Sequence, residues 1–239
     1  VRGVRREGDQ VVVSFDVAGH TTEESFDYAL AATGRRPNMA GLNLPAAGIA
    51  LDERGWAPGH RTTMQSGQSH VFVAGDATNE LPLLHEAADE GRIAGENAAR
   101  FPDVKTFERR SLLGVVFTDP QLATVGDSWR TLAGRGDVVV GQIDFGDQGR
   151  SRVMRINRGL LRVYAEAGSG RFLGAEMAGP RAEHIAHLLA WSHQQQMTIA
   201  RMLTMPFYHP VIEEGLRTAL RDAQAQLDER AQREGLATS

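Results

Sequence analysis

The chain has 239 residues, of which 41% are hydrophobic and 23% are charged, and it contains no cysteine. Its 26 Lys and Arg residues against 30 Asp and Glu residues give a formal net charge of -4, so the chain as a whole provides no basic field for nucleic acid or an anionic membrane. The lack of cysteine excludes disulfides, thiolate metal sites and thiol nucleophiles from these residues. Because no apolar run is long enough for a bilayer, we expect a soluble, cytoplasmic protein that binds neither nucleic acid nor membrane and carries no metal site.

The front of the chain predicts strands followed by one α/β unit. Alternating apolar residues predict a strand over 11–17, and a second apolar run predicts another over 26–32. Gly and Pro residues make 39–68 irregular. A short buried strand is expected over 70–74, and the helical spacing of apolar residues that begins after Pro82 continues to about residue 100. Because the chain starts directly on paired strands, we expect it to be part of a longer protein.

Beyond residue 109 the pattern changes to short strands that are followed by helices. Strands are expected over 115–117, 122–125, 138–145, 152–156, 160–167 and 172–177. Two helices are expected over 182–196 and 212–230. The fold class is therefore an α+β domain, with an antiparallel sheet and helices, preceded by part of an α/β domain.

Glycines before and within the last predicted strand imitate a dinucleotide-binding fingerprint. Gly168, Gly170 and Gly174 have a similar spacing, but the segment does not open a helix. We therefore expect a hairpin turn there.

Gly75 and Asp76 follow the strand expected over 70–74. A small residue allows close backbone approach, and a carboxylate at the carboxyl end of a strand lies where open α/β sheets bind ligands. The helix that follows would point its positive amino end toward the same place. The alternative is that Asp76 only caps the next turn.

A second group of chemically active residues lies near the end of the chain, in the order His209, Pro210, Glu213, Glu214. The proline keeps His209 out of helical geometry and is itself suited to a first helical turn. Inside a helix, His209 would pair with Glu213, whereas outside a helix a different carboxylate can orient it. The alternative is a routine helix cap.

Three segments of the front part together resemble a known family. They are Ala32-Thr33-Gly34-Arg35-Arg36-Pro37-Asn38, Val71-Phe72-Val73-Ala74-Gly75-Asp76 and Leu81-Pro82-Leu83-Leu84-His85-Glu86-Ala87 with Glu90-Gly91. This combination resembles the FAD-binding part of the pyridine nucleotide-disulfide oxidoreductases, and dihydrolipoamide dehydrogenase is the most similar type of member. The resemblance implies that Asp76 hydrogen-bonds the flavin ribitol and that Gly75 lets the cofactor approach. It also implies that Leu84, His85 and Ala87 face the flavin pyrimidine edge.

The end of the chain extends the same resemblance. The family has a His-Pro-x-x-x-Glu segment, which implies that His209 is the acid/base and that Glu214 orients its ring. Phe117-Thr118-Asp119-Pro120-Gln121 resembles the start of the family's dimerisation domain, although Gln121 replaces the usual glutamate. We expect 1–33 to be the tail of a nicotinamide-binding domain, 34–109 the end of the FAD-binding domain and 110–239 a dimerisation domain.

The resemblance implies a function for the parent protein. It would use FAD and NAD or NADP to move electrons between a dithiol and nicotinamide, as a homodimer built through 110–239. The redox dithiol and both glycine fingerprints would lie outside this chain, so we expect the isolated chain to be inactive and to hold FAD weakly or not at all. Two alternatives stay open: a non-catalytic dimerisation module, and a relative that reduces a metal ion, a quinone or a nicotinamide.

Overall fold

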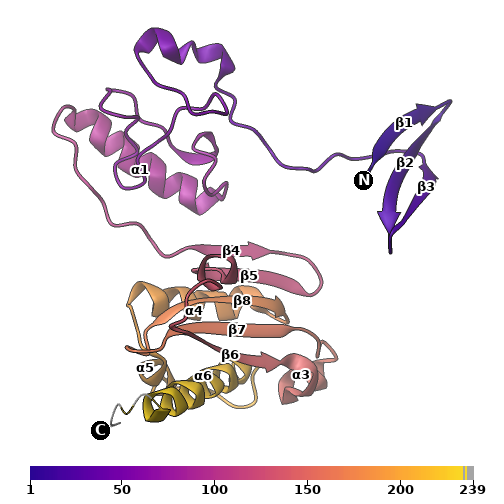
Figure 1. Ribbon diagram of the computed structural model, residues 1–239, viewed down its shortest axis with the longest axis vertical. Helices are drawn as coiled ribbons and strands as arrows, with labels where there is room; N and C mark the ends of the chain where they lie inside the picture. The colour runs from indigo at the N-terminus through magenta and orange to yellow at the C-terminus, as the bar shows by residue number, and fades with distance from the viewer. Residues whose placement is uncertain (234, 236–239) are drawn as a thin grey trace. The chain divides into compact units, whose positions relative to one another are not determined.

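The structure is a computed structural model that describes residues 1–233 and 235. The chain divides into two compact units, Val1–Thr106 and Phe107–Ser239, both drawn in Figure 1. Among the helices within the described residues, none combines the length and the apolar composition needed to cross a bilayer. Each unit is described below by itself.

The chain starts with a three-stranded antiparallel meander. Its strands are, in order, β1 (Gly3–Glu7), β2 (Gln10–Val17) and β3 (His20–Phe26). Ala18 and Gly19 form the two-residue turn between β2 and β3, and both have the positive φ that type I′ hairpin turns require. The prediction of a second strand over 26–32 is wrong, because this tight turn starts the strand at His20 and residues 27–33 lie outside regular secondary structure.

The rest of the first unit is organised by α1 (Leu84–Arg100), which the apolar spacing predicts correctly. Residues 39–68 contain two 3-10 turns, η1 (Ala40–Leu42) and η2 (Leu44–Ala47), and one isolated bridge residue, Gln65, so the prediction of an irregular segment is confirmed. A small apolar cluster consists of Met39, Ile49, Ala57 and Val73. Ile93 of α1 is fully buried.

The strand predicted over 70–74 is not formed. Within it, Phe72 makes an isolated antiparallel bridge with Gln65, and the N–H of Val73 donates to the carbonyl of Met64 at 2.8 Å. The segment therefore folds back on residues just before it. An apolar strand of this type needs hydrogen-bonding neighbours on both sides, and the described residues provide one short neighbour.

Asn97 connects α1 to the segments before and after it. Its side chain is fully buried, and Nδ2 donates to the carbonyls of Thr63 at 3.0 Å and Lys105 at 2.8 Å. The Oδ1 atom accepts the N–H of Lys105 at 2.9 Å. Both polar atoms of this buried amide are thus satisfied, as buried polar groups require.

A five-stranded antiparallel sheet forms the centre of the second unit (Figure 1). Its strands are β4 (Leu113–Val116), β5 (Gln121–Gly126), β6 (Val138–Asp144), β7 (Leu160–Glu166) and β8 (Phe172–Gly179), in the spatial order β4-β5-β8-β7-β6. The short α2 (Trp129–Leu132) follows β5. The glycines at 168 and 170 lie in the β7–β8 hairpin, as predicted.

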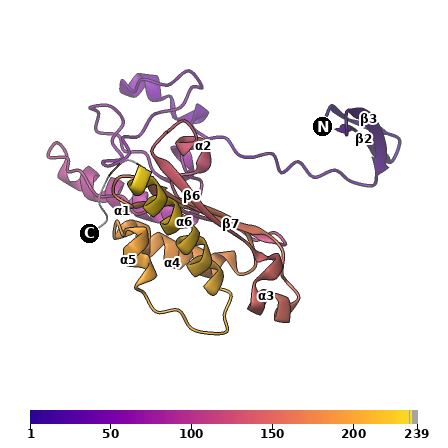
Figure 2. The same cartoon turned by 60° about the horizontal axis from the view of Figure 1, so that its bottom comes forward.

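Helices α4 (Ala182–Gln194) and α6 (Glu214–Arg233) cover one face of this sheet, and the short α5 (Ile199–Leu203) packs against α6. Helix α4 packs on β5 and β8, and α6 packs on β6 and β7, as the turned view in Figure 2 helps to follow. The main core lies between the helices and the sheet, and it includes Val125, Val163, Leu189 and Leu220. The expected α+β class is therefore confirmed.

The strand predicted over 152–156 is also wrong, because this region forms the helix α3 (Gly149–Met154) after the 3-10 turn η4 (Phe145–Asp147). Alternating Arg and apolar residues imitate a strand. The side chain of Gln148 caps the helix by accepting the N–H of Ser151 at 2.7 Å, and Arg155 ends it in a left-handed conformation. Local capping therefore determines the structure of this segment.

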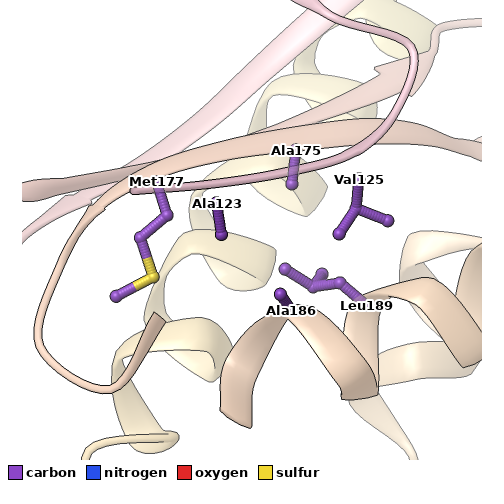
Figure 3. Close-up of a pocket in the computed structure, with 6 residues that line it drawn as sticks. All are labelled: Ala123, Val125, Ala175, Met177, Ala186 and Leu189. Carbon is purple, nitrogen blue, oxygen red and sulfur yellow. The ribbon is translucent and has the colours of Figure 1, made fainter. Parts of the chain in front are cut away.

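Small side chains allow α4 to approach the sheet closely (Figure 3). Six residues line the contact: Ala123 and Val125 from β5, Ala175 and Met177 from β8, and Ala186 and Leu189 from α4. All six are at least nine-tenths buried, and the gap between them has no room for a water molecule. The contact is thus a dry, closely packed part of the core.

Side chains of α6 also bind the backbone of β6. The carboxylate of Asp222 accepts the N–H of Gln142 at 2.8 Å, and Nε2 of Gln226 donates to the carbonyl of Val140 at 2.7 Å. The helix is therefore fixed to this strand by polar contacts as well as by apolar packing.

His193, near the end of α4, is partly buried. Its Nδ1 lies 2.7 Å from Oγ of Ser111, and its ring packs edge-on against Phe172 with the ring centroids 6.0 Å apart. Burial lowers the pKa of His193 below its ordinary value, because the imidazolium form loses hydration there.

Candidate functional site

The residues proposed to handle protons lie at the start of α6. His209 is in the connection between α5 and α6, and Glu214 is the first residue of α6. Helix α6 begins at Glu214, two residues later than the predicted 212. The N–H of Gly215 donates to the carbonyl of Ile212, and the N–H of Leu216 donates to the carbonyl of Glu213. Both bonds span three residues, whereas the bonds of an α-helix span four. His209 is therefore outside the helix, as Pro210 predicts.

His209 and Glu214 are brought together. Nδ1 of His209 lies 3.0 Å from Oε1 and 2.9 Å from Oε2 of Glu214. The His209 side chain is 80% exposed, whereas that of Glu214 is 18% exposed. An ionised carboxylate only accepts hydrogen bonds, so Nδ1 carries the proton and Nε2 holds the lone pair of the neutral ring. The arrangement leaves Nε2 available to accept a proton.

Two further groups hold the carboxylate of Glu214. The backbone N–H of Val211 donates to Oε2 at 3.3 Å, and Nη2 of Arg217 lies 3.5 Å from Oε1. The hydrogen bond from His209 is the largest of the effects that hold the pKa of Glu214 below its ordinary value. Sequence reasoning missed both Val211 and Arg217, although the spacing of Arg217 one helical turn after Glu214 was an available signal.

The neighbouring Glu213 has a different environment. Its backbone carbonyl accepts the N–H of Leu216 at 3.0 Å, and it is Glu214, not Glu213, that contacts His209. The pairing expected for a histidine inside the helix is therefore not the one found. The histidine and the carboxylate that the family resemblance selects are the two that meet.

The second predicted site lies in the first unit, where the chain passes from residue 74 into the 3-10 turn η3 (Gly75–Ala77). Gly75 has φ +67°, and a Cβ on it would lie 3.1 Å from Cβ of Ala87. Its N–H donates to Oε2 of the buried Glu90 at 2.7 Å. Contact with α1 thus accounts for the glycine without any ligand, and Glu90 is a residue to which the sequence motif gave no role.

Asp76 is the predicted ligand of the flavin ribitol. Its side chain is 45% exposed, and its Oδ2 lies 2.7 Å from Nη1 of Arg35. Nη2 of Arg35 also donates to the carbonyl of Pro82 at 3.3 Å. The guanidinium of Arg35 therefore joins Asp76 to the segment before α1.

Leu84 and His85 occupy the first turn of α1. The Leu84 side chain is 89% exposed, and the His85 side chain is 53% exposed with Nε2 3.9 Å from Oε1 of Glu86. Gly75 lies against Ala87 of α1, whereas Leu84 and the His85 side chain are exposed.

These residues fit part of a flavin site. Asp76 offers an accessible carboxylate that can accept a hydroxyl hydrogen bond, and the amino end of the long helix α1 offers backbone N–H groups and a positive dipole. No group of three or more His, Asp or Glu side chains suited to a metal ion is found within the described part of the chain.

Two sequence models of one family match the chain. The pyridine nucleotide-disulphide oxidoreductase model matches residues 1–91, and the model of the dimerisation domain of this family matches residues 113–220. The chain belongs to the pyridine nucleotide-disulphide oxidoreductases. The resemblance seen in its motifs is confirmed.

Within the family, dihydrolipoyl dehydrogenases are among the relatives. The one from Haloferax volcanii is 31% identical over 230 residues, which are 94% of this chain and 47% of the relative. A mercuric reductase from Acidithiobacillus ferrooxidans is 31% identical over 194 residues, or 81% of this chain and 35% of the relative. The crystal structure of LpdA from Mycobacterium tuberculosis superposes with a TM-score of 0.75 at 25% identity, over 92% of this chain and 47% of that one. The chain thus spans about half the length of the dihydrolipoyl dehydrogenase and about a third of the length of the mercuric reductase.

Proposed function

We propose that the whole protein is an FAD-dependent oxidoreductase that moves electrons between a dithiol and NAD or NADP through a redox disulfide. The observation that carries this proposal is the contact of His209 Nδ1 with the carboxylate of Glu214, in a member of a disulfide oxidoreductase family. FAD, when bound, supplies the two-electron acceptor between sulfur and nicotinamide. Asp76 and the amino end of α1 would hold it.

Proton transfer is the contribution of this chain. A substrate thiol gives its proton to Nε2 of His209, and the thiolate attacks one sulfur of a disulfide, so that a new S–S bond forms and the old bond leaves its electron pair on the second sulfur. Glu214 fixes the tautomer of His209 and stabilises its charged form. Because the 239 residues contain no cysteine, the thiol and the disulfide come from outside them.

We propose further that the parent acts as a cytoplasmic homodimer joined through 110–239. The match of this region to the family's dimerisation domain supports the dimer. Sedimentation of the 239-residue chain over a range of concentrations tests it, and a chain that stays monomeric at every concentration would contradict it. Cell fractionation tests the location.

Substitutions in the whole protein test the role of His209. His209→Gln is expected to lower the rate of lipoamide reduction by NADH by about a hundredfold or more, the usual contribution of a positioned acid/base. Glu214→Gln keeps an acceptor for Nδ1–H but removes the charge, so it is expected to lower the rate less. Glu213→Gln is the matched control and should keep the rate. Equal rates for the His209 variant and the unmodified protein would refute the assignment.

The isolated chain provides a second test. We propose that it does not reduce lipoamide and retains little FAD, since it spans about half the length of its relatives. Lipoamide reduction by the purified chain, or a flavin absorption band that co-purifies with it, would contradict this. The similarity to a mercuric reductase favours one alternative, electron transfer to a metal ion, and NADPH oxidation assayed with mercuric ion would reveal it.

A further inference from the structure

Gln148 is a buried polar residue that no motif singles out. Its side chain is 8% exposed and uses both ends of its amide. Oε1 accepts the N–H of Ser151 at 2.7 Å and so caps α3. Nε2 donates to the carbonyl of Val211 at 2.8 Å, across 63 residues of sequence. One side chain therefore joins the start of α3 to the segment that carries His209.

Val211 lies between the two residues of the proposed acid/base pair. Its carbonyl accepts from Gln148, and its N–H donates to the same Oε2 of Glu214 that Nδ1 of His209 contacts. The next residue, Ile212, is buried in the main core. The segment is thus held by an apolar anchor and by a hydrogen-bonded path from Gln148 through Val211 to Glu214.

We propose that Gln148 is a positioning residue for the His209–Glu214 pair. By fixing the carbonyl of Val211, it sets the direction of the Val211 N–H and keeps the Glu214 carboxylate between that N–H and the His209 ring. The proposal rests on the proposed function for its catalytic meaning, but the geometry it concerns can be measured without any activity.

The chemistry of the amide explains why glutamine suits this position. Capping α3 requires an acceptor, and holding the carbonyl of Val211 requires a donor. Glutamate keeps the acceptor and loses the donor, methionine loses both, and asparagine is one methylene shorter. The alternative is that Gln148 serves only as the cap of α3, in which case loss of the donor would not affect Val211 or Glu214.

Two variants of the 239-residue chain separate these roles. Gln148→Glu at pH 7.5 keeps the cap and removes the donor, and Gln148→Met removes both. Hydrogen exchange measured by NMR at two amides is the readout: the Ser151 amide reports the cap, and the Val211 amide reports the geometry around Glu214. Arg150→Gln, an exposed change on the same helix, is the control.

We expect Val211 amide exchange to accelerate roughly five- to tenfold in both variants, the loss that accompanies one ordinary hydrogen bond. Ser151 exchange should accelerate only in Gln148→Met. In that variant, NMR titration of the Glu214 carboxyl should also show its pKa rising toward the ordinary value, since the lowered pKa of Glu214 depends on its donors. Unchanged Val211 exchange in Gln148→Glu, or unchanged Glu214 titration in Gln148→Met, would overturn the proposal. If Gln148→Met does not fold, Gln148→Glu alone decides through Val211.

The outcome is independent of the proposed catalysis. Accelerated Val211 exchange in a protein whose His209→Gln variant keeps full activity would support the positioning role and refute the proposed function. If Val211 exchange is unchanged in Gln148→Glu but the His209→Gln variant of the whole protein is inactive, the positioning role is refuted and the proposed function is supported.

Discussion

Gly141 of β6 lies directly beneath Ala223 of α6. A Cβ on Gly141 would lie 2.5 Å from the backbone N of Ala223 and 2.6 Å from its Cβ, distances that atoms of a folded protein do not adopt. Glycine is therefore required at this point by the close approach of the helix to the strand. The backbone of Gly141 itself needs no special conformation.

Gly141→Ala is expected to destabilise the second unit by about 1–3 kcal/mol, the usual cost of forcing an extra methyl group into a packed core. Urea unfolding monitored by circular dichroism measures the change. Gly134→Ala is the matched control, because a Cβ there would meet nothing within 4 Å. Similar losses in the two variants would show that the helix adjusts to the methyl group.

The dry contact between α4 and the sheet provides a second prediction. Leu189→Ala should reduce the free energy of unfolding by about 2–5 kcal/mol, because it removes buried apolar atoms and leaves a cavity. Leu188 is its neighbour on the same helix and is 41% exposed, so Leu188→Ala should cost clearly less. Thermal or urea unfolding compares the two, and equal costs would contradict the packing shown in Figure 3.

Asn97→Ala tests the polar connection in the first unit. The substitution leaves the buried carbonyl of Thr63 and the backbone of Lys105 without their amide partner, which costs roughly 1–3 kcal/mol. Hydrogen exchange of the Lys105 amide should accelerate. The neighbouring Glu96→Ala, which removes only exposed ion pairs, should leave that amide protected. An unchanged Lys105 amide in Asn97→Ala would contradict the role of this contact.

His193 predicts a pH dependence of stability. Its pKa in the folded state is lowered, so the unfolded chain binds a proton more readily than the folded chain does. The contribution of neutral His193 is therefore fully present above its ordinary pKa of about 6.5 and is lost as the pH falls below that value. Unfolding measured at pH 7.5 and pH 5.0 checks this.

His193→Gln separates this histidine from the other seven of the eight in the chain. The variant should lose less stability than the unmodified chain between the two pH values. If both lose the same amount, the pH dependence arises elsewhere.

The pattern of apolar residues along the sequence predicted the helices and strands that bury a hydrophobic face. Helices α1, α4 and α6 show apolar residues at helical spacing, and the strands of the second sheet lie in short, mainly apolar segments, so these elements are confirmed. Their hydrophobic faces are local properties of the sequence. Pro210 and the acidic residues after it also indicated that His209 lies outside α6, next to a carboxylate.

Local chemistry and contacts between distant residues explain what the sequence did not predict. The strand expected over 152–156 became a helix because the cap from Gln148 outweighs a weak alternation of apolar residues. The bonds of Gln148 to Val211 and of Arg35 to Pro82 span 63 and 47 residues, and no spacing rule reaches so far. Contacts of this kind appear only when the fold is known.

The polar contacts of α6 with β6 have a consequence for association. β6 is the last strand of the sheet, and its outward backbone groups would otherwise be free to pair with a strand from another molecule. Asp222 and Gln226 occupy two of these groups, at Gln142 and Val140. The helix therefore makes strand addition at this edge less favourable, and β4 is the edge at which the five-stranded sheet is more open to a strand from another molecule.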